Sequence, residues 1–302
     1  MGHEVAMAGA VRPPLRGRRL NNALEVAGER FAELDRRRQY HLIRRERQFK
    51  PDLIITLDRR IHPWVVKELK SGGARVALWF PDAVSNLGRH DMFLAPYDRF
   101  FFKNPRLVDQ LSRVHQLPVS YLPEAANSDW HRSSEPYGAD EVVVIAGNIH
   151  PTRAILIDHL VQAGLPVVVY GSRPPKWVEF QSVTQAHTAR FIARREKASI
   201  FRRARVVLNN LHPAEYAGMN CRLFEAAASG AAVLTEVRPG LEDLFELNRE
   251  VIPFGSLDEL VVQCHRLLSD PSAGRATGDA AAYRAHREHT YEQRLGEMLS
   301  AF

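Results

Sequence analysis

Cysteine is nearly absent from this sequence: Cys221 and Cys264 are the only two among 302 residues. A disulfide framework needs several cysteines, and a common zinc site needs cysteines or histidines at short, fixed spacings, so the sequence predicts neither. Long apolar runs are missing too. None approaches the roughly 18 residues of a membrane-spanning helix, and the N-terminus has no signal-peptide apolar core. We therefore expect a soluble, cytoplasmic protein.

Acidic residues are outnumbered by basic ones, and the formal net charge is +6. The excess is densest in RRRQYHLIRRER (36–47), which holds six arginines. No zinc finger, recognition helix or module of mixed aromatic and basic residues accompanies this charge, so we expect no nucleic-acid partner. Two interpretations stay open: a solvated face of a long helix, or peripheral contact with the anionic inner face of a membrane.

Short apolar runs, rich in β-branched and aromatic residues, alternate with helical patterns along the chain. Such runs are typical of parallel strands that are buried on both faces. The expected strands are HEVAMAG (3–9), DLIITL (52–57), ARVALWF (74–80), RFFFK (99–103), VSYLP (119–123), EVVVIAG (141–147), PVVVYG (166–171), RVVLNN (205–210), AAVLTE (231–236) and EVIPF (250–254). The sequence therefore predicts an α/β fold built from doubly wound parallel sheets.

Turn-forming residues dominate the stretch from 124 to 140, which has no apolar periodicity. We place a linker at 126–140, between an N-terminal Rossmann-like domain (1–125) and a C-terminal one (141–288). We expect the last helix, about 289–302, to pack back on the N-terminal domain. Ligands of such sheets bind at the carboxyl ends of the strands, so the two domains are expected to face a cleft.

The second array of strands and helices opens on a glycine turn. Strand EVVVIAG ends at Gly147, and Asn148 leads to a helix with Arg153 in its first turn. Backbone N–H groups at such a turn bind anions such as a diphosphate, and an arginine adds a charge-assisted contact. Glycine also occurs in such turns for geometry alone, so both readings stay open. Gly171 and His212 follow the next two strands and are candidates for the same edge.

The stretch MNCRLFEAAASGAAVLTE (219–236) places one arginine and one glutamate in a run of small and apolar residues. Asn220, Arg222 and Glu225 fall near the start of the expected helix, where residues three apart share a face. A partly buried carboxylate needs a partner. Two hypotheses stay open: Glu225 forms a structural ion pair with Arg222, or it accepts both hydroxyls of a ribose.

The segments LNNLHPAEYAGMNCRLFEAAASGAAVLTE, LEDLFELNREVIPFGSLDEL and REHTYEQRLGEML resemble the C-terminal half of the spore maturation protein CgeB-like glycosyltransferases. KPDLIITLDRR, ALWFPDAV, DRFFFKN and VSYLPEAAN resemble their N-terminal half. The likeness spans nearly the whole chain from His3 and is most specific over 205–236. It implies a bacterial enzyme of the GT-B fold, related to the GT4-type retaining glycosyltransferases.

The resemblance also implies roles for single residues. Glu225 matches the ribose-binding glutamate of the E-A-x-A-x-G motif, and Asn220 and Arg222 match an N-x-R pattern near the donor. Gly147, Asn148 and Arg153 are placed near the diphosphate, and Asp82 on the acceptor side. GT4-type enzymes carry a second glutamate eight residues before the ribose one, where this chain has Ala217. The donor sugar is therefore not fixed by the resemblance.

The family implies a first strand and helix before a G-H-E-V turn, whereas this chain starts at MGHEV. We therefore expect the N-terminal sheet to lack its usual first strand and helix. VAMA (5–8) is then expected either to pair with LIITL (53–57) or to leave an unfilled slot beside it. A natural start upstream, and a longer chain that is more stable or more active, are further expectations.

No D-x-D motif is present to hold a divalent cation, and a helix N-terminus with arginines can stabilise a leaving diphosphate. We expect no metal and no cofactor. Asp82 and His62 are candidates for orienting the acceptor, a glycan, surface polymer or small molecule; a capped helix start and a surface imidazole are the structural alternatives.

The leading hypothesis is a metal-independent, retaining glycosyltransferase that uses a nucleoside-diphosphate sugar. A catalytically silent nucleotide-sugar-binding or coat-assembly protein is the first alternative, and Ala217 favours it slightly. A GT-B nucleotide-sugar epimerase is the second, although its converging acid and base residues are not identified in the sequence.

Overall fold

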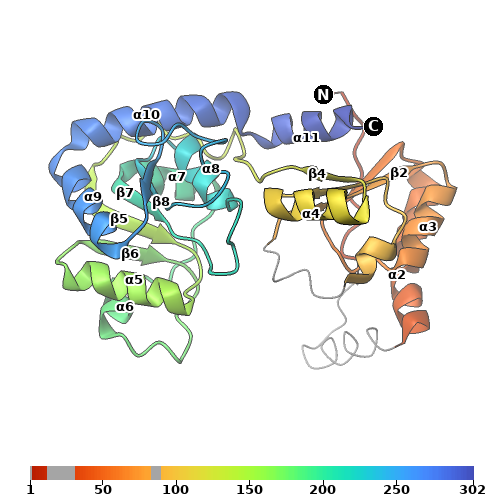
Figure 1. The fold of residues 1–302 in the computed structure, drawn as a ribbon, viewed down its shortest axis with the longest axis horizontal. Coiled ribbons are helices and arrows are strands. Elements are labelled where there is room, and N and C mark those ends of the chain that lie inside the picture. Colours follow the sequence, from red (N-terminus) through yellow and green to blue (C-terminus); the bar gives the residue numbers. More distant parts are fainter. Residues whose placement is uncertain (1, 12–30, 83–89) are drawn as a thin grey trace. The chain divides into compact units, whose positions relative to one another are not determined.

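The computed structural model describes residues 2–11, 31–82 and 90–302. The chain divides into two compact units, one ending at Leu122 with Phe302 added to it, the other spanning Pro123–Ala301. Each unit contains its own parallel sheet (Figure 1). The predicted α/β fold with two parallel sheets is therefore confirmed. Among the described residues, no helix combines the length and apolarity that crossing a bilayer requires.

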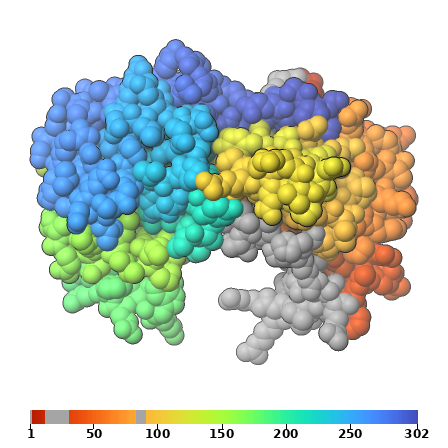
Figure 2. Space-filling view, in the orientation of Figure 1, coloured from red at the N-terminus to blue at the C-terminus, as the bar shows by residue number. Residues whose placement is uncertain are grey.

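Unit 1 holds a parallel sheet with strand order β1-β2-β3-β4 in its described residues. The core between sheet and helices contains the stacked rings of Phe100 and Phe102, 6.3 Å between centroids. In Figure 2, α4 lies at the surface of this unit, in keeping with its single buried side chain, Leu111. The elements are α2 (Ala32–Phe49), β1 (Leu53–Thr56), α3 (Pro63–Ser71), β2 (Arg75–Phe80), η2 (His90–Leu94), β3 (Arg99–Phe102), α4 (Pro105–His115) and β4 (Val119–Tyr121).

The predicted strand at 3–9 is wrong. Residues 2–10 form neither helix nor strand, and Val5 and Met7 are 77% and 83% exposed. In the described part of the chain, β1 pairs with β2 alone, so VAMA does not lie against LIITL. An extended segment becomes a strand only when a neighbour satisfies its backbone groups. This segment instead runs beside α2, where the Ala10 carbonyl contacts His41 Nε2 at 3.1 Å. The upstream start stays a prediction.

Unit 2 holds a parallel sheet with strand order β6-β5-β7-β8-β9. This order, with the first strand of the unit inside the sheet, is the doubly wound arrangement that the sequence predicts. The elements are β5 (Asp140–Ala146), α5 (Pro151–Gln162), β6 (Val167–Tyr170), α6 (Gln181–Ala186), α7 (Arg194–Arg203), β7 (Ala204–Asn209), α8 (Cys221–Ala228), β8 (Val233–Glu236), β9 (Ile252–Phe254), α9 (Leu257–Ser269), α10 (Pro271–Glu288) and α11 (Tyr291–Ser300).

Two apolar clusters cover the two faces of this sheet. One joins the sheet to α5 and α9 through side chains such as Ile157 and Leu260. The other joins it to α7, α8 and α10 through Phe201, Phe224 and Ala281. Burial on both faces explains why the strands are apolar throughout.

Helix starts are fixed by side chains that accept a backbone N–H bond. His150 caps α5, so this helix begins shortly after β5 ends. Asn220 caps α8, which therefore begins at Cys221. Such caps contribute about 1 kcal/mol each. The short α6 was not predicted, because QSVTQA carries little apolar pattern. The sequence from about 21 to 49 has the pattern of one long helix; residues 21–30 lie outside the described part of the chain, and the rest contains α2.

The predicted linker, 126–140, packs within unit 2. Ala126 pairs with Thr290, and the Tyr137 hydroxyl donates to the Arg205 carbonyl at 2.7 Å. Helix α11 belongs to unit 2 and Phe302 to unit 1. The expected domain boundaries, and the packing of the last helix on the N-terminal domain, stay predictions.

His289 is buried between α10 and α11 as a neutral imidazole. Its Nε2 donates to the Leu244 carbonyl at 2.7 Å, and its Nδ1 accepts from Arg294 at 2.8 Å. Burial, with Arg294 nearby, lowers the pKa of His289 to about 4. The unfolded chain takes up this proton at a pH of about 6.5, before the folded chain does. The free energy of unfolding therefore falls as the pH drops from about 6.5 to 4, by up to about 3 kcal/mol from this group.

We expect His289→Gln to keep both hydrogen bonds and to remove this part of the pH dependence. Urea unfolding of both proteins across this pH range measures it. Equal pH dependence in the two proteins would contradict the assignment of a neutral His289.

Candidate functional site

Two glycines meet where β5 and β6 end. The Gly147 N–H donates to the Tyr170 carbonyl at 2.8 Å, and a Cβ on Gly171 would lie 2.5 Å from the Gly147 carbonyl oxygen. Gly147 has a φ of +126°, a conformation that side chains rarely adopt. The turn therefore requires glycine at both positions.

Arg153, in the first turn of α5, is 3% exposed. Its guanidinium donates to the Asn210 side chain at 2.7 Å, to the Asn210 carbonyl at 2.9 Å and to the Asn148 carbonyl at 2.6 Å. All three acceptors are neutral. Burial, and then the charge of Arg222, lower the pKa of Arg153 to about 9, so it stays charged at neutral pH. Arg153 thus joins the turn after β5 to the end of β7.

Arg222 reaches the same turn from α8. A Cβ built on Gly147 would lie 2.5 Å from an Arg222 nitrogen and 2.9 Å from an Arg153 nitrogen, so both guanidiniums border one point. Arg222 has one long hydrogen bond, 3.5 Å to the Asn209 side chain. Within the described residues, neither arginine has a carboxylate within 4.0 Å. Two crowded cations without a paired anion are an arrangement that favours binding of an anion, so this turn is a candidate anion site.

Two histidines stand next to these arginines. His150 Nδ1 accepts from the Arg153 backbone N–H at 3.3 Å, and the rings of His150 and His212 meet edge to face with centroids 5.0 Å apart. Burial, with the charge of Arg153 next, lowers the pKa of His150 to about 4. His150 is therefore neutral at physiological pH, and the positive charge here belongs to the arginines.

Glu225 faces partners that the sequence did not suggest. Its carboxylate accepts from Lys197 Nζ at 2.9 Å and lies 3.6 Å from His131 Nε2. Among the described residues, its ion pairs are with these two and not with Arg222, so the hypothesis of an Arg222–Glu225 ion pair is wrong. Residues three positions apart on a helix share a face, as Arg222 and Glu225 do. The Arg222 side chain nevertheless extends to Gly147 and not to Glu225.

The other predicted residues lie as follows. Asn220 caps α8, its side chain accepting from the Leu223 N–H at 3.3 Å, and Asn148 contributes its carbonyl to Arg153. In unit 1, Asp82 is exposed just after β2. His62 caps α3, with Nδ1 accepting from the Trp64 N–H at 3.1 Å. His62 is thus the N-cap of α3, a role that differs from the surface imidazole given above as its structural alternative.

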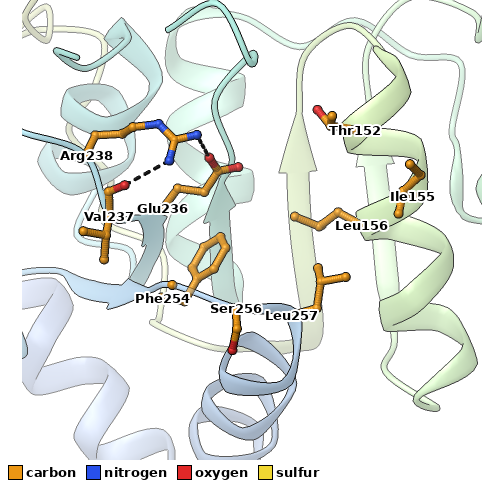
Figure 3. Close-up of a pocket in the computed structure, with 10 residues that line it drawn as sticks. Thr152, Ile155, Leu156, Glu236, Val237, Arg238, Phe254, Ser256 and Leu257 are labelled. Carbon is orange, nitrogen blue, oxygen red and sulfur yellow. Dashed lines mark hydrogen bonds and ion pairs between the residues drawn. The ribbon is translucent and has the colours of Figure 1, made fainter. Parts of the chain in front are cut away.

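A hollow of about 460 Å³ lies beyond the ends of β8 and β9 (Figure 3). Figure 3 shows Arg238 folded back onto Glu236 and the Val237 carbonyl, so this charged pair is satisfied internally. None of the predicted site residues lines the hollow. Its lining is Thr152, Ile155, Leu156, Glu236, Val237, Arg238, Phe254, Gly255, Ser256 and Leu257.

Sequence reasoning missed several residues that shape the site. Asn209 and Asn210 end the strand RVVLNN, and two buried amides after an apolar strand are a signal that was present. Lys197 and His131 carried no such signal, because they come from α7 and from the linker. In the described part of the chain, no group of three His, Cys, Asp or Glu side chains is placed to hold a metal ion.

Comparison with known proteins adds a family and a fold. Residues 153–300, just under half of the chain, match the family described as glycosyl transferase-like. A comparison with curated proteins gave no match.

Solved structures share the fold at low sequence identity. Sucrose-phosphate synthase from Thermosynechococcus elongatus is 17% identical, with a TM-score of 0.61 over 86% of this chain and 76% of that one. The HepE protein of Anabaena, in complex with UDP, is 14% identical, with a TM-score of 0.64 over 86% and 81%. A UDP-forming α,α-trehalose-phosphate synthase from Burkholderia xenovorans, in complex with glucose-6-phosphate, is 11% identical, with a TM-score of 0.60 over 86% and 76%.

The two parallel sheets therefore match those of GT-B glycosyltransferases. The fold is thus the one shared with these structures, and residues 153–300 are similar to the family described as glycosyl transferase-like. The narrower resemblance to the CgeB-like family is not tested by these matches.

The close approach of Gly171 to Gly147 gives a direct test of the turn. We expect Gly171→Ala to lower the free energy of unfolding by about 1–3 kcal/mol, because its Cβ would meet backbone and force the turn apart. Gly255→Ala is a suitable control, since its Cβ meets nothing closer than a Glu259 oxygen at 3.7 Å. Urea unfolding compares the two variants, and equal losses would show that the approach is not tight.

Proposed function

We propose that this chain is a glycosyltransferase that transfers a sugar from a nucleoside-diphosphate sugar to an acceptor. One observation carries the proposal: Arg153 and Arg222 converge on the glycine turn after β5, and no carboxylate of the described residues pairs with either of them. A diphosphate supplies the missing negative charge. Structures with the same fold support this donor class, since HepE has been solved with UDP and with UDP-glucose.

The proposed reaction needs charge stabilisation of the leaving group. As the bond from the anomeric carbon to the diphosphate breaks, negative charge grows on the diphosphate oxygens, where the two guanidiniums lie. Groups fixed in place before the reaction stabilise such charge effectively. We further propose that transfer is retaining and metal-independent, with a leaving-group oxygen accepting the proton of the acceptor. Asp82 and His62 stay our candidates for orienting the acceptor.

Glu225 is our candidate for the ribose hydroxyls. Lys197 and His131 hold its carboxylate in one orientation, and its side chain is 14% exposed, so a ligand reaches it from one side only. The CgeB-like family, on the strength of residues 205–236, is the narrower assignment that we propose, with a cytoplasmic location in a bacterium.

The arginines and the glutamate are expected to act on different parts of the donor. Calorimetry with UDP, GDP and dTDP first identifies a nucleotide that binds. We expect Arg222→Met to weaken binding of that nucleotide by about 1.5–3 kcal/mol, the scale of hydrogen bonds to charged groups, and to weaken pyrophosphate binding as well. Stability should change little, because Arg222 makes one long hydrogen bond. If none of the three nucleotides binds the wild-type chain, the proposal is wrong.

Glu225→Ala is expected to weaken nucleotide binding by about 1.5–3 kcal/mol while leaving pyrophosphate binding unchanged. Lys197→Met is the matched control, because it breaks the same ion pair but keeps the carboxylate. Loss of stability in both variants, with unchanged nucleotide affinity, would make Glu225 purely structural.

A catalytically silent nucleotide-sugar-binding protein is the second candidate. Ala217, which is 1% exposed, stands where GT4-type enzymes have the glutamate that contacts the transferred sugar. An assay of donor hydrolysis across UDP-, GDP- and dTDP-sugars separates the two functions. Turnover that Arg222→Met abolishes supports the transferase, whereas nucleotide binding without turnover of any donor supports the silent protein.

A further inference from the structure

The exposed face of α2 in unit 1 is strongly basic. Arg37, Arg44, Arg45 and Arg47 are exposed along it, and Lys50 ends it. The buried face is different: Leu42 and Ile43 enter the core of the unit. The charges therefore form one continuous surface on the side of α2 that faces away from the core.

Within the described part of the chain, the side chains of two of these arginines have no partner. Arg37 pairs with Glu33 at 3.2 Å, and Arg47 lies 3.8 Å from Glu68. Among the described residues, Arg44 and Arg45 have neither an ion pair nor a hydrogen bond. Their charges are available to an external anion.

The N-terminal segment adds Met7 to the same surface, and Val5 lies two residues before it in the chain. Val11 is buried in the core of unit 1, and the Ala10 carbonyl contacts His41 of α2, so the segment is held against the helix. Val5 and Met7 nevertheless stay 77% and 83% exposed. A shallow hollow of about 280 Å³ joins the segment to the arginines, with Met7, Ala8, His41, Arg44, Arg45 and Gln48 around it.

Exposed aliphatic groups beside unpaired arginines fit one kind of partner best. Lipid phosphates attract the guanidiniums, while the interface below them accepts Val5 and Met7. A nucleic acid backbone offers phosphates too, but nothing apolar for protruding aliphatic side chains. Among the described acids, Glu33 is already paired with Arg37 and Glu68 lies against Arg47, so neither is paired with Arg44 or Arg45.

We propose that this surface, formed by Val5, Met7, Arg44 and Arg45, docks the protein on an anionic phospholipid bilayer. The arginines provide attraction and the two aliphatic side chains enter the interface. The proposal does not depend on the proposed function, since α2 lies in unit 1 and the arginine pair of the donor site in unit 2.

Co-sedimentation of the full chain with vesicles tests the proposal. One vesicle type contains phosphatidylcholine alone, and the other mixes it with phosphatidylglycerol. We expect binding only to the anionic vesicles, and Arg44→Gln/Arg45→Gln to weaken it roughly tenfold, since each basic residue near such a surface strengthens binding several-fold. Val5→Ser/Met7→Ser is expected to weaken binding as well, without changing net charge. Circular dichroism checks that each variant is folded.

The control is Arg106→Gln/Arg113→Gln, which removes the same charge from exposed positions of α4 in the same unit. It should leave binding within about twofold of wild type, because it does not touch the docking surface. Equal losses in the two arginine variants, equal binding to both vesicle types, or no effect of the Val5 and Met7 substitutions would each overturn the proposal. Binding to duplex DNA that depends on Arg44 and Arg45, without vesicle binding, would assign the surface to nucleic acid.

Discussion

The buried guanidinium of Arg153 is the contact on which the carboxyl edge of the C-terminal sheet depends. It is held by neutral oxygens of Asn148 and Asn210, one from the turn after β5 and two from the end of β7. Removing a charged group from water is costly, and these hydrogen bonds offset only part of that cost. The same contacts fix the turn at Gly147, because the Asn148 carbonyl cannot move without losing Arg153. The same guanidinium therefore holds the turn at Gly147 in place and supplies positive charge beside it.

Much of this edge follows from local sequence. Parallel strands end at one side of a sheet, so Gly147, Gly171 and the residues after RVVLNN had to gather there once the strands were recognised. The apolar runs identified those strands to within a residue or two, because burial on both faces leaves little room for polar side chains. Arg153 could be placed at this edge too, because it lies in the first turn of the helix that follows β5.

Other features depend on distant parts of the chain, and the sequence did not reveal them. The ion pair of Glu225 joins α8 to Lys197 of α7, whereas helical spacing offered only Arg222 as a partner, in one of two open hypotheses. Spacing gives the residues that share a helix face, but the length of an arginine side chain lets it reach a different element. The strand expected at 3–9 failed because alternating apolar residues form a strand only where a neighbouring strand exists. In this structure the segment contacts α2, through the Ala10 carbonyl and His41, and not a strand.

The separation of Glu225 from the arginines decides the charge of the site. An ion pair between Arg222 and Glu225 would have cancelled one of the two guanidinium charges at Gly147. Lys197 balances Glu225 instead, so both guanidinium charges remain at the turn. A diphosphate that links a nucleoside to a sugar carries two negative charges, one on each phosphate. On the proposed function, the match is therefore one of charge as well as of position.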